Sequence, residues 1–212
     1  MSESTIVNIA LVIAISYLCG SFPTAYIVAK MRGINIFEIG SGNMGATNVI
    51  RAMGMGWGIL VWFLDSAKAI VAILIAVQII PNNTALATVL AAVAAIAGHN
   101  WSFFVALITG TIRGGKGAAT AFGTLFMIVP IYVIAVMLLI GGAIVALTRY
   151  VSLAVLVMFG LATVWMLVLT SQEIIPWEYA IYSLILAGLI LYRFRENIQR
   201  LMSGTERRLG ER

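Results

Sequence analysis

A polar, glycine-rich segment, "GSGNMGATNVIR" at residues 40–51, stands between two apolar runs and has the composition of an anion-binding loop. Its glycines, which allow unusual backbone dihedrals and close approach of a ligand to backbone amides, are Gly40, Gly42 and Gly45. Its neutral hydrogen-bonding side chains are Ser41, Asn43, Thr47 and Asn48. Arg51 follows Thr47 by about one helical turn and has the geometry to bind phosphate through paired hydrogen bonds. The segment fits a phosphate site, and a turn that only reverses the chain is the alternative.

The second glycine-rich segment is "TGTIRGGKGAAT" at residues 109–120. The spacing from Gly110 to Gly115 and Lys116 resembles the phosphate loop GxxxxGK[ST], but Gly117 occupies the position of the hydroxyl residue that binds magnesium. No strand–helix–strand pattern surrounds it, so a nucleotide-binding loop is excluded. Glycine amides at the start of a helix, together with Arg113 and Lys116, still favour anion binding.

Three further polar residues stand inside apolar runs. Asp65 and Lys68 are spaced i, i+3 in "WFLDSAKAI", so they can neutralise each other on one helix face, but an intramembrane acid is also functional by default. Both interpretations stay open. His99 is the only histidine, and no GxSxG motif supplies a nucleophile for it, so we expect a structural role. With one histidine and a single cysteine, Cys19, we expect no metal, no cofactor and no intrachain disulfide.

The composition defines the class of protein that must position these residues. Hydrophobic residues make up 62% of the 212, and charged residues only 10%, far below the fraction in soluble domains. Several apolar runs are long enough to cross a bilayer. The net charge of +5 comes from basic residues beside the apolar runs, where topology places them, so nucleic-acid binding is not indicated. The sequence predicts an all-α, polytopic membrane protein.

The basic residues also predict an orientation. Lys and Arg occur in the breaks at residues 30–54, 109–117 and 148–150 and after residue 192, and are absent from residues 81–83 and 171–177. The positive-inside rule then places the basic breaks in the cytoplasm. The first run, residues 6–29, lacks a basic leader and is interpreted as a retained first helix. We expect one domain, residues 1–212, ending in a cytoplasmic, basic, amphipathic tail at residues 193–212, which either lies on the membrane surface or closes over a cytoplasmic active site.

The apolar stretch at residues 118–147 is flanked by basic residues at both ends, which a single crossing does not allow. Pro130 near its middle predicts two short helices hinged there, either as two short spans or as a re-entrant pair. Counting them as two gives about seven transmembrane helices, with the N-terminus outside and the C-terminus in the cytoplasm.

The motifs together resemble a known family. "GSGNMGATNVIRAMG", "FLDSAKA", "GHNW", "RGGKGAATAFG", "TRYVSLA" and "YRFRENIQRLMSGTE" occur in the order found in the bacterial membrane acyl-phosphate:glycerol-3-phosphate acyltransferases, the PlsY family. The resemblance covers nearly the whole chain. It implies a seven-helix enzyme of the bacterial inner membrane whose active site faces the cytoplasm, and it implies glycerol 3-phosphate, acyl phosphate and membrane lipids as partners, with a monomeric chain.

The resemblance also implies the reaction and its residues. A fatty acyl group moves from acyl phosphate to the 1-hydroxyl of glycerol 3-phosphate, giving lysophosphatidic acid and phosphate, with a substrate phosphate oxygen accepting the proton. The catalytic residues implied are Lys116, Arg51 and Ser41. The substrate-binding residues implied are Asn43, Thr47, Asn48, Gly114, Gly115, Gly117, Thr120 and Asn197.

Four features depart from the family pattern. The family commonly has proline at Met44, serine at Val155 and histidine at Phe194, and a shorter spacing from His99 to Gly114. A divergent, non-catalytic lipid-binding paralogue is therefore one alternative. A transporter of a small anion or ion that uses Asp65 and Lys68 is another, although its polar groups would have to cross the bilayer.

Overall fold

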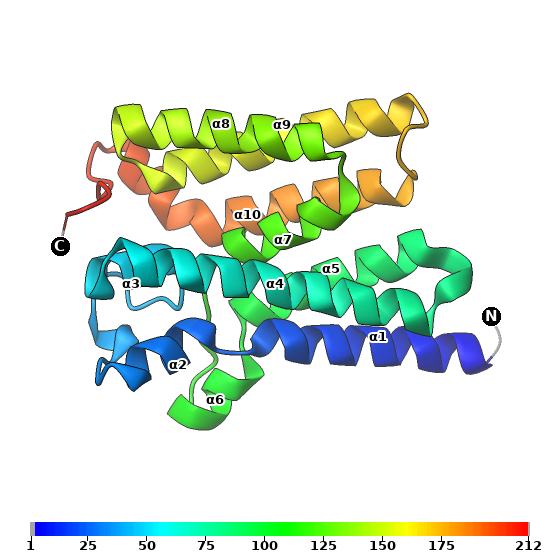
Figure 1. Ribbon diagram of the computed structural model, residues 1–212, viewed down its shortest axis with the longest axis horizontal. Coiled ribbons are helices and arrows are strands. Elements are labelled where there is room, and N and C mark those ends of the chain that lie inside the picture. The colour runs from blue at the N-terminus through cyan, green and yellow to red at the C-terminus, as the bar shows by residue number, and fades with distance from the viewer. Residues whose placement is uncertain (1–2, 212) are drawn as a thin grey trace. The chain divides into compact units, whose positions relative to one another are not determined.

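The computed structural model describes residues 3–211, with side chains from residue 5, and every regular element in that range is helical. Figure 1 shows the helices in chain order. They are α1 (Glu3–Ser21), α2 (Thr24–Met31), α3 (Ala46–Met53), α4 (Met55–Ile79), α5 (Thr84–Asn100), α6 (Phe103–Thr109), α7 (Ala118–Ile128), α8 (Ile131–Thr148), α9 (Val151–Ser171) and α10 (Glu178–Met202). Short 3₁₀ turns are η1 (Ile36–Glu38) and η2 (Pro81–Asn83). The chain forms two compact units, residues 1–127 and 128–212, which we describe separately.

The helices confirm a membrane protein and leave the number of crossings open. Five segments are long and apolar enough to span a bilayer: Thr5–Met31, Met55–Ile79, Pro81–Asn100, Ile131–Thr148 and Val151–Ser171. The 11-residue α7 is shorter than a full span. The C-terminal half of the 25-residue α10 carries several charged side chains. The count of seven crossings and the orientation of the termini stay predictions.

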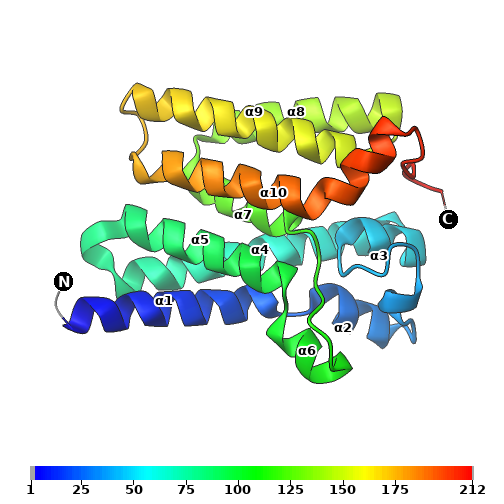
Figure 2. The ribbon, with the colours of Figure 1, turned by 180° about the vertical axis from the view of Figure 1, so that it is seen from behind.

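The first unit is built around three helices that approach closely. Helices α1, α4 and α5 pack against one another and lie side by side in Figures 1 and 2. A Cβ at Gly20 of α1 would overlap the backbone of Ala95, and a Cβ at Gly98 of α5 would overlap the backbone of Tyr17. Glycine at both positions therefore allows α1 and α5 to make backbone contact, which is how membrane helices gain dispersion energy in the absence of a hydrophobic driving force.

The first apolar run, residues 6–29, was predicted to form one helix, but the structure has two helices there. The run breaks after Ser21, and Pro23 caps α2, because proline cannot donate the backbone hydrogen bond that a continuous helix requires. The carbonyl of Phe22 accepts instead from the backbone of Thr24 at 3.0 Å and from Nζ of Lys68 at 3.0 Å. The break thus provides a backbone acceptor for a charged side chain on α4.

The second break, at Pro130, confirms the two helices predicted from the sequence, but only α7 is short, since α8 is long and apolar enough to span a bilayer. Helix α7 ends at Ile128, and α8 begins at Ile131 with Pro130 as its N-cap. Two helices thus replace one stretch of about thirty apolar residues, since proline disfavours continuation of the preceding helix.

In the second unit, α9 packs against both α8 and α10. The basic tail predicted at residues 193–212 divides in two: residues 193–202 continue α10, and the residues after Met202 form turns. The chain then returns to the α8–α9 turn, where the backbone N–H of Leu209 donates to the carbonyl of Arg149 at 2.7 Å. The Arg149 guanidinium donates in turn to the carbonyl of Leu209. Reciprocal bonds therefore fix the end of the tail to this turn.

Candidate functional site

The first glycine-rich loop is shaped by one buried asparagine. Asn48, on α3 and only 2% exposed, accepts a hydrogen bond from the backbone N–H of Ser41 at 3.0 Å and donates to the carbonyl of Ile36 at 3.1 Å. Gly40 has φ of +58°, and a Cβ there would overlap the Asn48 amide oxygen. Both polar atoms of Asn48 are occupied by the protein, so the structure gives this predicted substrate ligand a role in holding the loop.

Three neutral polar side chains of this loop are available to a ligand. Within the described residues, the hydroxyls of Ser41 and Thr47 and the amide of Asn43 form no hydrogen bond, and Ser41 is exposed. The stem of Arg51 passes beside the loop, because a Cβ at Gly40 would lie 3.5 Å from Cδ of Arg51. This short stretch of chain thus carries two hydroxyls, an amide and an arginine side chain.

The second glycine-rich loop, Gly114 to Gly117, lies against the end of α5. The N–H of Gly115 donates to the carbonyl of His99 at 3.0 Å. A Cβ at Gly114 would overlap the backbone of His99 and Asn100, and a Cβ at Gly115 would overlap the His99 ring. Gly117, with φ of +78°, lies against the side chain of Asn100. Lack of space, as well as backbone conformation, therefore requires glycine here. Lys116, between two of these glycines, is partly buried.

The two loops come together in space. A Cβ at Gly115 would lie 2.8 Å from the carbonyl oxygen of Met44. Nearby, the guanidinium of Arg113 lies 5.8 Å from the ring centroid of Phe37. The prediction that the two anion-binding segments share one site is supported in its geometry, because segments about 70 residues apart are in contact within one compact unit.

A buried ionic network stands behind the second loop. Nζ of Lys68 lies 2.8 Å from Oδ1 of Asp65 and donates to Nδ1 of His99 at 2.9 Å, and it also reaches the Phe22 carbonyl. Since an ammonium group only donates, Nδ1 of His99 must be the acceptor, which leaves the ring proton on Nε2. That edge of the ring faces Gly115. The structure thus gives Asp65, Lys68 and His99 a role in positioning the loop.

The longer spacing between His99 and Gly114 has a local explanation. The chain leaves the site at Ser102 and returns at Arg113, where the N–H of Ser102 donates to the carbonyl of Arg113 at 3.1 Å. Helix α6 lies within this excursion. Because Ser102 and Arg113 are hydrogen-bonded to each other, the extra residues lie between them and the bond from Gly115 to His99 is kept.

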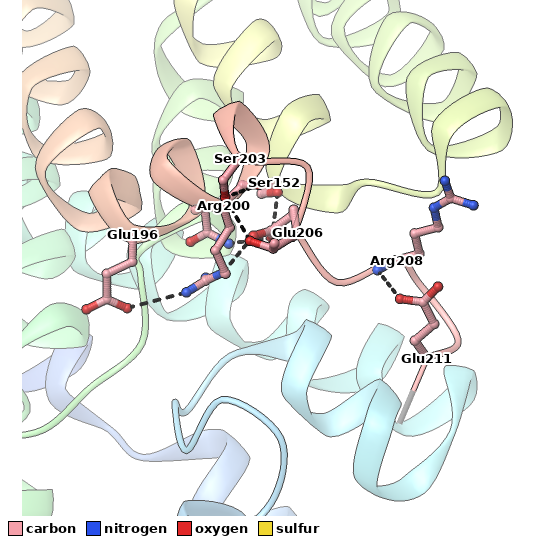
Figure 3. Close-up of polar contacts among 9 residues, drawn as sticks. Ser152, Glu196, Arg200, Ser203, Glu206, Arg208 and Glu211 are labelled. Atoms are coloured by element: carbon pink, nitrogen blue, oxygen red, sulfur yellow. Dashed lines mark hydrogen bonds and ion pairs between the residues drawn. The ribbon is translucent and has the colours of Figure 1, made fainter.

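In the second unit, Asn197 belongs to a cluster around Glu206, shown in part in Figure 3. Glu206 accepts hydrogen bonds from Ser152 at 2.8 Å, from Asn197 at 2.6 Å and from Arg200 at 2.8 Å. Burial raises the pKa of the Glu206 carboxyl, but these hydrogen bonds and the Arg200 charge outweigh it, so the pKa lies below its ordinary value. The amide nitrogen of Asn197, a predicted substrate ligand, donates to this carboxylate.

Sequence reasoning missed Glu206 and Asn100. A lone acid among the basic residues of "GTERR" was a signal for Glu206, and adjacency to His99 was one for Asn100. The departures at Met44, Val155 and Phe194 are all buried apolar side chains, at 3%, 8% and 6% exposure. Met44 packs in a cluster with Ile36 and Val49, which anchors its loop without proline.

Comparison with known proteins gives a consistent result. The profile of the family described as glycerol-3-phosphate acyltransferase matches residues 10–204. The glycerol-3-phosphate acyltransferase of Halalkalibacterium halodurans is 40% identical over 93% of each chain, and that of one strain of Thermus thermophilus is 42% identical over 93% of this chain and 94% of its own.

Two crystal structures of PlsY (YgiH), an integral membrane glycerol 3-phosphate acyltransferase, are also similar, each at 36% identity. The glycerol 3-phosphate form has a TM-score of 0.82 and covers 95% of this chain and 96% of its own. The lysophosphatidic acid form has a TM-score of 0.81 and covers 95% of each chain.

Proposed function

Because the chain belongs to the glycerol-3-phosphate acyltransferase family of integral membrane enzymes, we propose that its acyl donor is an acyl phosphate and its acceptor the 1-hydroxyl of glycerol 3-phosphate. The products are lysophosphatidic acid and phosphate. Contact between two glycine-rich loops at Met44 and Gly115 carries the proposal. A reaction between two phosphate-bearing substrates needs two neighbouring anion sites, and each loop is accompanied by a cation, Arg51 or Lys116.

Each loop receives one substrate. The first loop binds glycerol 3-phosphate, with the Arg51 guanidinium on the phosphate and Ser41, Asn43 and Thr47 as neutral donors. The second loop binds the acyl phosphate through the backbone amides of Gly114 and Gly117, while Gly115, whose N–H donates to the His99 carbonyl, holds the loop against α5. Lys116 neutralises the charge that grows on the departing phosphate.

The reaction needs little chemistry from the side chains. The 1-hydroxyl oxygen bonds to the acyl carbon, the bond from that carbon to the bridging oxygen breaks, and the bridging oxygen leaves with phosphate. The hydroxyl proton passes to a phosphate oxygen of the donor. Since the anhydride has a good leaving group, positioning and charge neutralisation supply most of the acceleration. His99 is unsuited to act as base, because its Nδ1 already accepts a hydrogen bond from Lys68.

In this proposal the protein lies in a bacterial inner membrane and its active site faces the cytoplasm. Arg51, Arg113 and Lys116 lie in or beside the basic breaks, which the positive-inside rule assigns to that side. Asn197, whose amide donates to Glu206 within the second unit, stays a predicted substrate ligand. The chain acts as a monomer and needs no metal or other cofactor.

Donor identity is tested with purified protein in detergent. Palmitoyl phosphate, palmitoyl-CoA and palmitoyl-acyl carrier protein are each supplied with glycerol 3-phosphate, and lysophosphatidic acid and free phosphate are both quantified. Only palmitoyl phosphate should give lysophosphatidic acid, with one phosphate released per acyl group transferred. If the protein used one of the thioesters but not palmitoyl phosphate, the donor assignment would be wrong and the family assignment would stay intact.

A further inference from the structure

Asn100, the last residue of α5, buries an amide that the protein does not use. The residue is 1% exposed, and neither Oδ1 nor Nδ2 has a hydrogen-bond partner among the residues that the structure describes. A buried, unpaired amide costs about 1–3 kcal/mol, and most buried polar side chains in proteins are paired. Asn48, equally buried in the same unit, has both amide atoms bonded. The unpaired state of Asn100 therefore calls for a partner.

The Asn100 amide faces the second glycine-rich loop. A Cβ at Gly117 would lie 2.7 Å from Oδ1 and 3.3 Å from Nδ2 of Asn100, so only glycine leaves room for the amide at this point. Gly117 immediately precedes α7, an 11-residue helix. The first turn of a helix presents unpaired N–H groups and a partial positive charge, which favour an anion.

A second buried polar atom lies in the first turn of α7. The hydroxyl of Thr120 is fully buried, and no residue in the described part of the chain bonds to it. Two unsatisfied polar groups thus stand at the same helix N-terminus, one from α5 and one from α7 itself. A ligand with several acceptor oxygens bound at this N-terminus would accept from the Asn100 N–H and the Thr120 O–H, whereas an apolar ligand would leave both donors unpaired.

We propose that Asn100 is a substrate-binding residue whose amide N–H donates to the phosphate group of the acyl donor at the N-terminus of α7, beside Thr120 and Lys116. The inference rests on the proposed function, because that function assigns this loop to the acyl phosphate. The unpaired N–H of Asn100 destabilises the ligand-free enzyme and is paired only when phosphate binds. Stability lost in the free protein in this way reappears as binding selectivity, because a ligand without phosphate would leave the amide unpaired.

The test is Asn100→Leu, which keeps the approximate shape of the side chain and removes its polar atoms. We expect the ligand-free protein in detergent to unfold at an unchanged or higher temperature. The KM for palmitoyl phosphate should rise at least tenfold, and the KM for glycerol 3-phosphate should stay within twofold of wild type. Inorganic phosphate should raise the unfolding temperature of the wild type but not that of Asn100→Leu. Thr88→Val, which alters a buried hydroxyl on α5 outside the site, serves as control and should match wild type.

Other outcomes overturn the proposal. A lower unfolding temperature in Asn100→Leu would mean that the amide stabilises the fold. A rise confined to the KM for glycerol 3-phosphate would assign the same chemistry to the other substrate, and wild-type constants would remove Asn100 from the site. If wild type fails to use palmitoyl phosphate, the proposed donor is wrong, but protection by inorganic phosphate still tests Asn100 by itself.

Discussion

The two glycine-rich loops of the first unit, each proposed to bind a phosphate group, are held in shape by different interactions. The first is folded around hydrogen bonds to Asn48, and its glycines adopt positive φ at Gly40 and Gly42. The second is pressed against α5, where a Cβ at Gly114 or Gly115 would overlap other atoms. A loop held by hydrogen bonds keeps polar side chains free for a ligand, whereas a loop held by close packing presents mainly its backbone. This difference suits the proposed substrates: polar side chains of the first loop would bind glycerol 3-phosphate, and backbone amides of the second would bind the phosphate of the acyl donor.

Gly115→Ala should have the largest effect. The added methyl would overlap the His99 ring, which Lys68 holds in place, and would press on the Met44 carbonyl. We expect kcat/KM to fall by at least about a hundredfold. Gly56→Ala is the matched control and should retain activity, because at this helical glycine of α4 no other atom of the described residues would lie within 4 Å of the new methyl. Near-normal turnover in Gly115→Ala would show that close packing does not require glycine at this position of the second loop.

Removal of either cation should have the next largest effect. Lys116→Ala and Arg51→Ala should each lower kcat/KM by at least about tenfold, or ~1.4 kcal/mol of transition-state stabilisation. Lys116→Ala should act mainly on kcat, because the charge it neutralises grows as phosphate leaves, and Arg51→Ala mainly on the KM for glycerol 3-phosphate. Lys30→Ala, an exposed cation at the end of α2, is the control. If Lys116→Ala instead raised the KM for glycerol 3-phosphate and Arg51→Ala lowered kcat, the two substrates would have been assigned to the wrong loops.

Asn48→Ala should act on stability before chemistry. It removes an acceptor for Ser41 and a donor to Ile36, so we expect the free energy of unfolding to fall by about 1–3 kcal/mol. Thermal unfolding in detergent measures this. Asn48→Asp retains the acceptor but buries a carboxylate whose second oxygen meets the Ile36 carbonyl, so it should be at least as destabilising as alanine at neutral pH. Unchanged stability in Asn48→Ala, combined with a raised KM for glycerol 3-phosphate, would restore Asn48 as a direct ligand.

The smallest effect is expected from protonation of Glu206 in the second unit, a carboxylate held by hydrogen bonds as the first loop is. Its folded pKa lies below the ordinary 4.5, so its stabilisation is complete above that value and is lost as pH falls through the folded pKa. Unfolding temperature should therefore decline below about pH 4.5 more steeply in wild type than in Glu206→Gln. Parallel curves would mean that Glu206 contributes no pH-dependent stability.

Particular residues illustrate how far sequence reasoning reached. Pro130 predicted the break between α7 and α8 correctly, because the effect of proline on a helix is local. Pro23 had the same local effect but was overlooked within a long apolar run. Asn48 was assigned to substrate because its type and spacing suited an anion, yet its partners are backbone groups that only the folded loop brings within reach. The assignments of Ser41, Arg51 and Lys116 stay predictions.

The sequence by itself determined an all-helical membrane protein of the glycerol-3-phosphate acyltransferase family, since apolar length, basic breaks and ordered motifs are properties of the chain alone. Only the tertiary structure decided that Met44 meets Gly115, that Asp65, Lys68 and His99 form one network, and that, among the described residues, the Asn48 amide is paired while the Asn100 amide is not. The physical reason is that hydrogen-bond satisfaction and steric room depend on atoms from distant parts of the chain. Residue type specifies what a side chain can bind, and the fold decides which of those bonds are already made.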